Sequence, residues 1–436
     1  MTALPAASGR DQRPEAGPGL DLLSLWRPGG FLLEREGLGV VGTGEARRIE
    51  IPSGPDQAIR AARLADAALA GLGVDDAVIV ACLPFRGDQP ASLVVPRRVT
   101  VSSIFPRTVQ VVSDGRADGV PAQAPASGPT MPGAADSPPI AGSLPGPTPG
   151  PLQPFTWRAE PPAADFGAAV AEAVRRIGAG DLRKVVLARS LTAADPGIDV
   201  GALLAELRRR NPGCHLFAAP TPDRGTFVGA TPEILVRREG DQVLSLPLAG
   251  TAARSPEPGL DREIATALLR SVKDLQEHAP VVEAIADTLA PHCHELSVEA
   301  SPHLMGTSTA WHLATSVRGR LRASAPSALS LAAALHPTPA VCGTPTVAAA
   351  SLIEELEPHP RGLYSGIVGW VDGRGDGEWA VSLRCALITR GRVRLHAGAG
   401  IIAGSDPLAE IAETEVKFRT LMEALEATRL SSGRAV

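Results

Sequence analysis

The C-terminal stretch 394–425, RLHAGAGIIAGSDPLAEIAETEVKFRTLMEAL, constrains the fold most, because signals for a strand, a turn and a helix follow one another within it. Arg394 to Ala397 alternates in character and predicts a strand, and Gly398-Ala399-Gly400 predicts a glycine turn. Ser405-Asp406-Pro407 supplies an N-cap and a proline suited to the first helical turn. The helix that follows has an apolar stripe that we expect to be buried, formed by Ile411, Phe418, Met422 and Leu425.

The same predicted helix places Glu410, Glu413 and Lys417 on a second face, at positions i, i+3 and i+7. Two carboxylates one turn apart can hold Mg²⁺, which typically binds one or two carboxylates together with substrate and water. The amides of Gly398 to Gly400 can approach a small anion closely, because glycine has no side chain. The alternative is a solvated helix face with an ordinary i,i+4 ion pair.

Composition excludes several classes of protein. The 436-residue chain has a net charge of −5, so nucleic acid is not an expected partner. No apolar run reaches membrane-spanning length, and the polar N-terminus has no apolar signal core, so we expect neither a membrane partner nor secretion. The cysteines show no CxxC spacing, and we expect reduced thiols in a cytoplasmic protein at Cys82, Cys214, Cys293, Cys342 and Cys385.

The chain divides into four parts by composition. Residues 1–20 are polar and rich in Pro and Gly, and we expect them to be disordered. Residues 21–112 predict short strands and one helix, whereas residues 113–154 are so rich in Pro and Gly that we expect a mobile insertion or linker. Residues 155–430 carry most of the helix and strand signals. Because strands outnumber βαβ patterns, we predict an α+β fold built on antiparallel sheets.

Long periodic runs in the last part predict several of its elements. Gly225–Arg237 and Gln242–Leu248 predict a hairpin over a Glu-Gly-Asp turn. Gly259–Leu289 predicts the longest helix, while His312–Val317 and Glu378–Ile388 each predict a strand.

Two ionisable residues lie in otherwise apolar surroundings. Lys184 opens the predicted strand KVVLA; a buried ammonium there is disfavoured and becomes a usable base, whereas a lysine at a sheet edge merely extends to solvent. Glu233 lies in GATPEIL, where an acid flanked by a turn and apolar residues can have a raised pKa and act as a general acid. The alternative is a surface carboxylate in a turn.

Two further polar positions are ambiguous on pattern alone. Asp274 and Glu277 lie at i and i+3 on a predicted helix, which is also typical of an ordinary charged face. Arg384 lies in the predicted strand VSLRCAL, where its guanidinium requires a carboxylate partner, either from the protein or from a bound molecule.

The order and spacing of these motifs resemble those of the chorismate-using enzymes: isochorismate synthases, salicylate synthases, aminodeoxychorismate synthase and the large subunit of anthranilate synthase. The resemblance covers residues from about 166 to 425, is weaker before residue 113, and has no counterpart for the Pro/Gly-rich insertion. The motifs that carry it are KVVLAR from Lys184, GATPEIL from Gly229, PLAGT from Pro247, SVKDLQEH from Ser271, WHLAT from Trp311, HPTPAVCGTP from His336, RGLYSGIVGW from Arg361, LRCA from Leu383 and HAGAGIIAGSDPLAEIAET from His396.

The resemblance implies a large fold of antiparallel sheets in a sandwich flanked by helices. It also implies that Lys184 is the general base on an attacking water and that Glu233 is the general acid on a departing hydroxyl. Magnesium is the implied cofactor, bound by Glu277 and Glu413, with Glu410 and Asp274 in the water-mediated shell.

Chorismate, a dianion, is the implied substrate and needs several donors. The resemblance assigns its carboxylates to Tyr364, Arg384, Lys417 and the amides of Gly398, Ala399 and Gly400. It assigns the lining of the ring to Thr251 and His312. Enzymes of this family are often monomeric, and we expect a monomer.

The stretch HPTPAVCG discriminates among branches of the family, because members that eliminate pyruvate usually carry threonine at the position of Ala340. The retained Lys184 indicates water rather than ammonia as nucleophile. We therefore expect an isochorismate synthase serving a siderophore, salicylate, menaquinone or specialised pathway. The alternatives are a bifunctional salicylate synthase, a non-catalytic chorismate-binding homologue and an amidotransferase-linked synthase.

Overall fold

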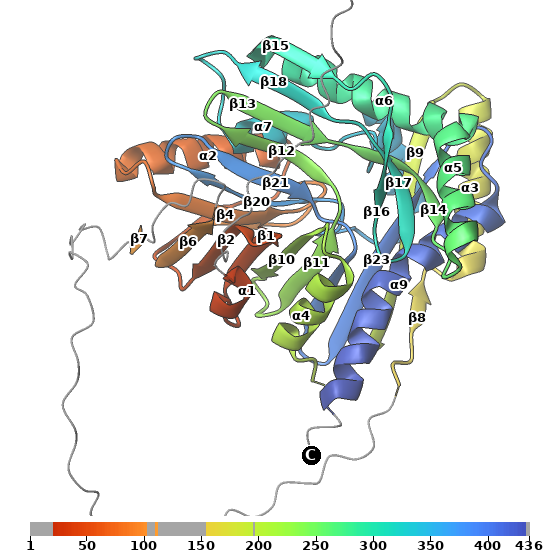
Figure 1. Ribbon diagram of the computed structural model, residues 1–436, viewed down its shortest axis with the longest axis horizontal. Helices are drawn as coiled ribbons and strands as arrows, with labels where there is room; N and C mark the ends of the chain where they lie inside the picture. The colour runs from red at the N-terminus through yellow and green to blue at the C-terminus, as the bar shows by residue number, and fades with distance from the viewer. Residues whose placement is uncertain (1–20, 103–109, 112–153, 195–196, 433–436) are drawn as a thin grey trace, which may run out of the picture.

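The computed structural model describes residues 21–102, 110–111, 154–194 and 197–432 (Figure 1). Residues 1–20 and 113–153, for which a disordered start and a mobile insertion are predicted, lie outside this part of the chain. Within it, no helix is both long and apolar enough to cross a membrane.

Two large antiparallel sheets form the body of the molecule. The first, called the large sheet, has eleven strands among the described residues. In spatial order they are β19 (Gly343–Thr344), β9 (Lys184–Ala194), β23 (Arg392–Ile401), β22 (Cys385–Thr389), β11 (Thr226–Thr231), β10 (His215–Pro220), β1 (Phe31–Arg35), β2 (Leu38–Thr43), β6 (Arg98–Ser102) and β7 (Gln110–Val111), with β8 (Arg158–Glu160) also paired to β9.

The second sheet has nine described strands, in the order β15 (Cys293–Val298), β18 (Val317–Leu321), β13 (Gln242–Leu246), β12 (Ile234–Glu239), β21 (Gly377–Val381), β20 (Ile367–Asp372), β4 (Val78–Leu83), β5 (Ala91–Val95) and β3 (Arg47–Ile51). A small sheet is formed by β14 (Leu248–Ala253), β17 (Ala310–Ala314) and β16 (His303–Gly306). Strands from before and after the insertion therefore share both large sheets.

Helices cover the outer faces of this sandwich (Figure 1). On the large sheet lie α1 (Leu22–Leu25), α4 (Val200–Arg210) and α9 (Pro407–Ser432), while α2 (Gln57–Leu72) and α7 (Ala328–Leu335) cover the second sheet. Near β9 lie α3 (Ala163–Gly178) and α8 (Thr346–Leu356); beside the small sheet lie α5 (Pro258–Arg270) and α6 (Val272–Leu289), which leads into the 3₁₀ turn Ala290–His292.

The core lies in layers between these elements. Side chains such as Phe31, Phe217 and Val368 fill the space between the two large sheets, because alternate residues of each strand face inward. A second cluster joins the large sheet to its helices and includes Leu204 and Phe418. The prediction of an α+β fold with antiparallel sheets in a helix-flanked sandwich is confirmed.

Four predicted single elements are each divided in two, three of them because the chain changes sheets. Gly225–Arg237 divides into β11 of the large sheet and β12 of the second sheet, although the hairpin of β12 and β13 is present. Glu378–Ile388 divides likewise into β21 and β22, and His312–Val317 into the ends of β17 and β18. The helix predicted over Gly259–Leu289 is divided at Ser271, the N-cap of α6. Apolar residues continue on both sides of each break, so periodicity alone does not reveal it.

The glycine turn predicted at Gly398-Ala399-Gly400 is also wrong. These residues continue β23, where Gly398 lies opposite Ala188 of β9 and the chain turns only after Ile401. Asp406 accepts a hydrogen bond from the backbone N–H of Ala409 at 2.8 Å, which confirms the predicted N-cap. In the expected apolar stripe of α9, Phe418 and Leu425 are buried, while Ile411 and Met422 are partly buried.

Candidate active site

The sheet crossings position two of the predicted site residues. Glu233 lies between β11 and β12, and Arg384 lies between β21 and β22, so Arg384 is not within a strand as predicted. The crossings are tied together, because the N–H of Val381 donates to the carbonyl of Glu233 at 3.1 Å. Arg384 has φ of +46°, a left-handed conformation that is uncommon for a side-chain-bearing residue. Such a conformation is typical of a functional position.

A small cavity of about 60 Å³ opens where these crossings meet the small sheet and α9. This volume has room for only a few water molecules, and charged side chains converge around it. Of the predicted site residues, those that line it are Glu233, Thr251, Glu277, His312, Ala340, Tyr364, Arg384, Gly398, Gly400, Glu413 and Lys417. Lys184, Asp274, Ala399 and Glu410 are not part of its lining.

Glu233 is almost fully buried, at 2% exposure. Burial raises the pKa of its carboxyl to about 8, although the positive charges of Arg384, Lys184 and Lys417 act in the opposite direction. The side chain therefore holds its proton at neutral pH. A protonated carboxyl facing a cavity can donate that proton to a leaving group.

Lys184 begins β9 and is buried, also at 2% exposure, so it does not extend to solvent. Its Nζ lies 3.1 Å from Oε1 of Glu277 and 3.4 Å from the backbone carbonyl of the same residue. Glu277 in turn lines the cavity. The lysine thus reaches the cavity wall through Glu277, which comes from α6.

Arg384, His312 and Thr251 form a chain of hydrogen bonds along one wall. Nη2 of Arg384 donates to Nε2 of His312 at 2.9 Å, since a guanidinium is a donor only. The His312 Nδ1–H then donates to Oγ1 of Thr251 at 3.2 Å. Burial, followed by the charge of Arg384, lowers the pKa of His312 well below its usual value, so the ring is neutral. Nε of Arg384 is buried without a partner among the described residues.

The glycines of β23 give the cavity an open backbone edge. The N–H of Val186 donates to the carbonyl of Cys342, away from β23, so its partner Gly400 also points away from β9. Gly398 has the same orientation, and its carbonyl accepts from Nζ of Lys417 at 2.7 Å. By the same alternation, Ala399 is bonded within the ladder to β9. The amides that face away from β9 are therefore those of Gly398 and Gly400, whereas the prediction named all three.

Tyr364 closes another side of the cavity. Its ring stacks on His396, with centroids 5.1 Å apart, and burial raises its pKa to about 12. A Cβ built at Gly398 would lie 2.9 Å from the Tyr364 hydroxyl, so the glycine leaves room for that group.

Three lysines each pair with one carboxylate beside the cavity. Besides Lys184 and Glu277, Nζ of Lys417 lies 2.5 Å from Oε1 of Glu413, and Nζ of Lys273 lies 3.0 Å from Oε1 of Glu410. Glu410 and Glu413 come from α9, whereas Glu277 comes from α6. The ion pair between Lys273 and Glu410 therefore links α6 to α9.

Among the described residues, no group of three or more His, Cys, Asp or Glu side chains is arranged to hold a metal ion. The acids nevertheless crowd one another. Burial raises the pKa of Glu413, the charge of Lys417 lowers it, and the neighbouring Glu277 and Glu410 raise it further. Burial also raises the pKa of Asp274, in the first turn of α6. The carboxylates of Glu413 and Asp274 are oxygen ligands of the kind that Mg²⁺ uses, and a bound cation would stabilise their ionised forms.

Two polar residues at the site, Lys273 and Ser365, were not predicted. Lys273 lies within the quoted SVKDLQEH motif, but a lysine beside an aspartate on a helix looks like an ordinary charged face. Ser365 has φ of +59°, is fully buried and lines the cavity. Its positive φ has no signal in the sequence, because it follows from the turn before β20.

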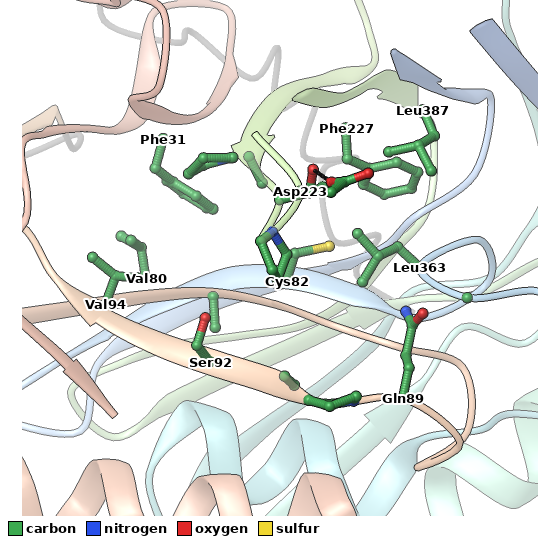
Figure 2. Close-up of a pocket in the computed structure, with 18 of the residues that line it drawn as sticks. Phe31, Val80, Cys82, Gln89, Ser92, Val94, Asp223, Phe227, Leu363 and Leu387 are labelled. Atoms are coloured by element: carbon green, nitrogen blue, oxygen red, sulfur yellow. Dashed lines mark hydrogen bonds between the residues drawn. The ribbon is translucent and has the colours of Figure 1, made fainter. Parts of the chain in front are cut away.

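A much larger cavity, of about 580 Å³, lies between the two large sheets and is separate from this site. Figure 2 shows its mostly apolar walls, with Phe31, Val94 and Phe227 around it and Gln89 near one end. Tyr364 lines both cavities. The larger cavity lacks the cluster of acids and lysines that distinguishes the smaller one.

Comparison with known proteins agrees with this geometry. The family model described as Chorismate binding enzyme matches residues 147–426. This chain belongs to the chorismate binding enzyme family.

Its similar relatives include named isochorismate synthases. Isochorismate synthase DhbC of Bacillus subtilis (strain 168) is 47% identical over 272 residues, which cover 61% of this chain and 68% of the relative. Isochorismate synthase EntC of Escherichia coli (strain K12) is 39% identical over 372 residues, covering 85% of this chain and 86% of the relative.

Solved structures show the same fold. The crystal structure of DhbC from Bacillus anthracis superposes with a TM-score of 0.78 and 34% identity, covering 93% of this chain and 98% of that one. MenF, the menaquinone-specific isochorismate synthase from Escherichia coli, superposes with a TM-score of 0.69 and 25% identity. The match covers 94% of this chain and 92% of that one.

Proposed function

We propose that this protein is an isochorismate synthase, an isomerase that converts chorismate reversibly to isochorismate. The observation that carries the proposal is a buried carboxyl that keeps its proton on the wall of the small cavity, together with a buried lysine on another element that reaches the same wall through Glu277. The names of the DhbC and EntC relatives support the same reaction.

In this proposal Glu233 acts as the general acid. The hydroxyl that leaves the ring must take up a proton, or it would depart as an unstable hydroxide. A carboxyl with a pKa of about 8 is protonated at neutral pH and is still acidic enough to give the proton up as the bond breaks.

Lys184 acts as the general base on the attacking water. The reaction adds water to one ring carbon while the hydroxyl leaves from another, so the base and the acid must stand on different walls. Lys184 opens β9, whereas Glu233 lies at the crossing from β11 to β12. Burial excludes bulk water, which limits the nucleophile to a molecule held beside the substrate.

The two carboxylates of chorismate meet the free donors of the cavity. Arg384 has a buried Nε with no partner among the described residues, and the amides of Gly398 and Gly400 face away from β9. Lys417 and the Tyr364 hydroxyl stand beside these amides. Buried donors without partners are costly unless a ligand satisfies them, which favours an anionic substrate.

Glu277 and Glu413 are proposed to bind Mg²⁺ directly, with Glu410 and Asp274 holding its water molecules. When bound, the ion stabilises negative charge on the ring carboxylate as the hydroxyl departs. Lys184 and Lys417 each pair with Oε1 of these glutamates, so the second oxygen of each carboxylate is the one that would face the ion.

Ala340 favours retention of the enolpyruvyl group. It lies in the loop between α7 and β19 and lines the cavity, where its methyl group offers no hydroxyl to a reacting atom. A salicylate synthase that goes on to expel pyruvate is the second candidate.

We also propose that the protein is cytoplasmic and a monomer. One chain supplies every residue of the cavity, which supports the monomer, and sedimentation of the purified protein would test the oligomeric state.

Product analysis tests the proposal. Purified protein would be incubated with chorismate, with Mg²⁺ and with a chelator, and isochorismate, salicylate and pyruvate would be resolved by chromatography. Isochorismate in equilibrium with chorismate, formed with the metal and not by Lys184→Ala, is the expected result. Stoichiometric pyruvate would establish the salicylate synthase, and no turnover would favour a non-catalytic homologue.

A further inference from the structure

Arg361 is a buried arginine next to the cavity that the proposed chemistry does not use. It is 5% exposed and lies between α8 and Tyr364. Its Nη2 donates to the carbonyl of Val186 at 2.6 Å, and its Nη1 donates to the carbonyl of Val341 at 2.7 Å. Its Nε donates to both carboxylate oxygens of Glu357, at 2.9 and 3.1 Å.

These bonds join separate walls of the candidate site. Val186 lies two residues after Lys184 on β9, Val341 directly follows Ala340, and both valines line the cavity. Glu357 extends the junction, because its Oε1 also accepts from the N–H of Ala188 at 2.8 Å. One guanidinium therefore connects the strand of the proposed base, the loop that carries Ala340 and the end of α8.

The geometry needs an arginine rather than any cation. The planar guanidinium presents several donors in a fixed fork, so it can satisfy two carbonyls and a carboxylate at once. A lysine ammonium can keep the charge pair with Glu357 but is a compact point charge that cannot span the same set of acceptors. The ring of Phe85, 4.4 Å from the guanidinium carbon, packs on its face.

We propose that Arg361 is a positioning residue that holds the Ala340 loop in place against the Lys184 strand during isochorismate formation. This inference rests on the proposed function. Arg361 does not touch the reacting atoms, but it determines the separation of the walls between which the substrate lies. A looser loop would misplace the enolpyruvyl group relative to Lys184, and a displacement of about 1 Å can lower a rate by roughly 10²-fold.

The test compares Arg361→Lys with a matched control, Arg237→Lys. Arg237 is also an arginine in a charge pair, with Glu378, but it lies on the second sheet and does not line the small cavity. For Arg361→Lys we expect kcat/KM for chorismate to fall roughly 10- to 100-fold, with a raised KM and more pyruvate per isochorismate. The control should lower the melting temperature and leave KM and the product ratio unchanged.

If Arg361 had a purely structural role, Arg361→Lys would only reduce the folded fraction of the enzyme. The measured kcat would then fall in proportion, while KM and the product ratio would stay unchanged. That result for Arg361→Lys would overturn the inference. If this variant does not fold, Glu357→Gln tests the same junction, and we expect a smaller rise in KM; an unchanged KM would again contradict the proposal. An inactive wild-type protein would refute the proposed function instead, so the two failures are distinguishable.

Discussion

Glu233 shows how strongly one position in the fold changes the chemistry of a side chain. The residue lies in a turn, where a carboxylate is usually solvated, yet it is buried because the chain passes there from one sheet to the other. Burial favours its neutral form, and the nearby cations are not sufficient to reverse the shift. The proposed acid is therefore a consequence of topology.

Glu233→Gln should lower kcat roughly 10²- to 10⁴-fold, because the amide has no proton to donate. In the wild type, kcat/KM should fall about tenfold per pH unit above a pH of about 8, as the acid loses its proton. Steady-state rates between pH 6 and roughly 10 check both statements. A pH-independent rate across that range would rule out Glu233 as the acid.

Thermal unfolding supplies the control for this variant. Above its usual pKa of 4.5 the unfolded chain loses the Glu233 proton, while the folded chain keeps it up to about pH 8. Stability contributed by this group therefore falls as pH rises through that interval. Glutamine removes the effect, so Glu233→Gln should melt no lower than the wild type at pH 7, and its loss of activity is not a loss of fold.

Individual site residues could be predicted where their chemistry conflicts with their surroundings. Lys184 and Glu233 are ionisable residues in apolar stretches, which the sequence displays directly. Lys273, Ser365 and the left-handed conformation of Arg384 could not be predicted in this way, because they depend on contacts between elements distant in the chain.

At the scale of elements, β23 brings backbone rather than side chains to the site. A Cβ built at Gly400 would overlap Oε1 of Glu277. This strand therefore requires glycine for close approach, although its φ is not left-handed. The predicted glycine turn is part of a strand instead, since glycine also occurs in strands where another group approaches closely.

Gly400→Ala should lower kcat/KM at least about tenfold, because the methyl group displaces Glu277 from its place beside Lys184. Gly404→Ala is the matched control, since a Cβ there meets nothing within 4 Å and the residue lies in the following turn. Steady-state kinetics would compare kcat/KM of both variants with that of the wild type. Equal activity of the two would show that the glycine is not needed for the position of Glu277.

The facing helices α6 and α9 are proposed to supply the metal ligands. Glu413→Ala should remove an acid of that set, and we expect both activity and Mg²⁺ binding by calorimetry to be lost. Glu415→Ala is the control, because Glu415 lies on the same helix but pairs with Arg189 and does not line the cavity. Unchanged Mg²⁺ affinity in Glu413→Ala would exclude that residue from the metal site.

Element types were mostly predictable, and element ends at the site were not. The strands and helices follow clear periodic patterns, but the chain changes sheets from β11 to β12 and from β21 to β22 after only two or three intervening residues. Each crossing follows from pairing with a strand far along the chain, β22 for β11 and β21 for β12. A local pattern carries no information about those partners.

The whole molecule depends on strands from both sides of the insertion. β1 pairs with β10 in the large sheet, and β4 pairs with β20 in the second sheet. The family model matches residues 147–426, but the segment before the insertion completes both sheets of the sandwich. It is therefore part of the same folding unit in the described structure.

A fragment of residues 154–436 should not fold to the native state, because β10 and β20 would become unpaired edges and the apolar layer between the sheets would be exposed. Circular dichroism and thermal unfolding would check this, with the full chain as control. A cooperative melting transition in the fragment near that of the full chain would contradict the account.

The central claim is that water attacks the ring of chorismate while the original hydroxyl leaves. The most direct measurement is a reaction of the wild-type protein in ¹⁸O-labelled water, with the position of the label in the product determined by mass spectrometry and NMR. The account predicts isochorismate with one ¹⁸O in its new ring hydroxyl. Unlabelled isochorismate would mean that the hydroxyl migrates within the molecule, and would contradict the roles proposed for Lys184 and Glu233.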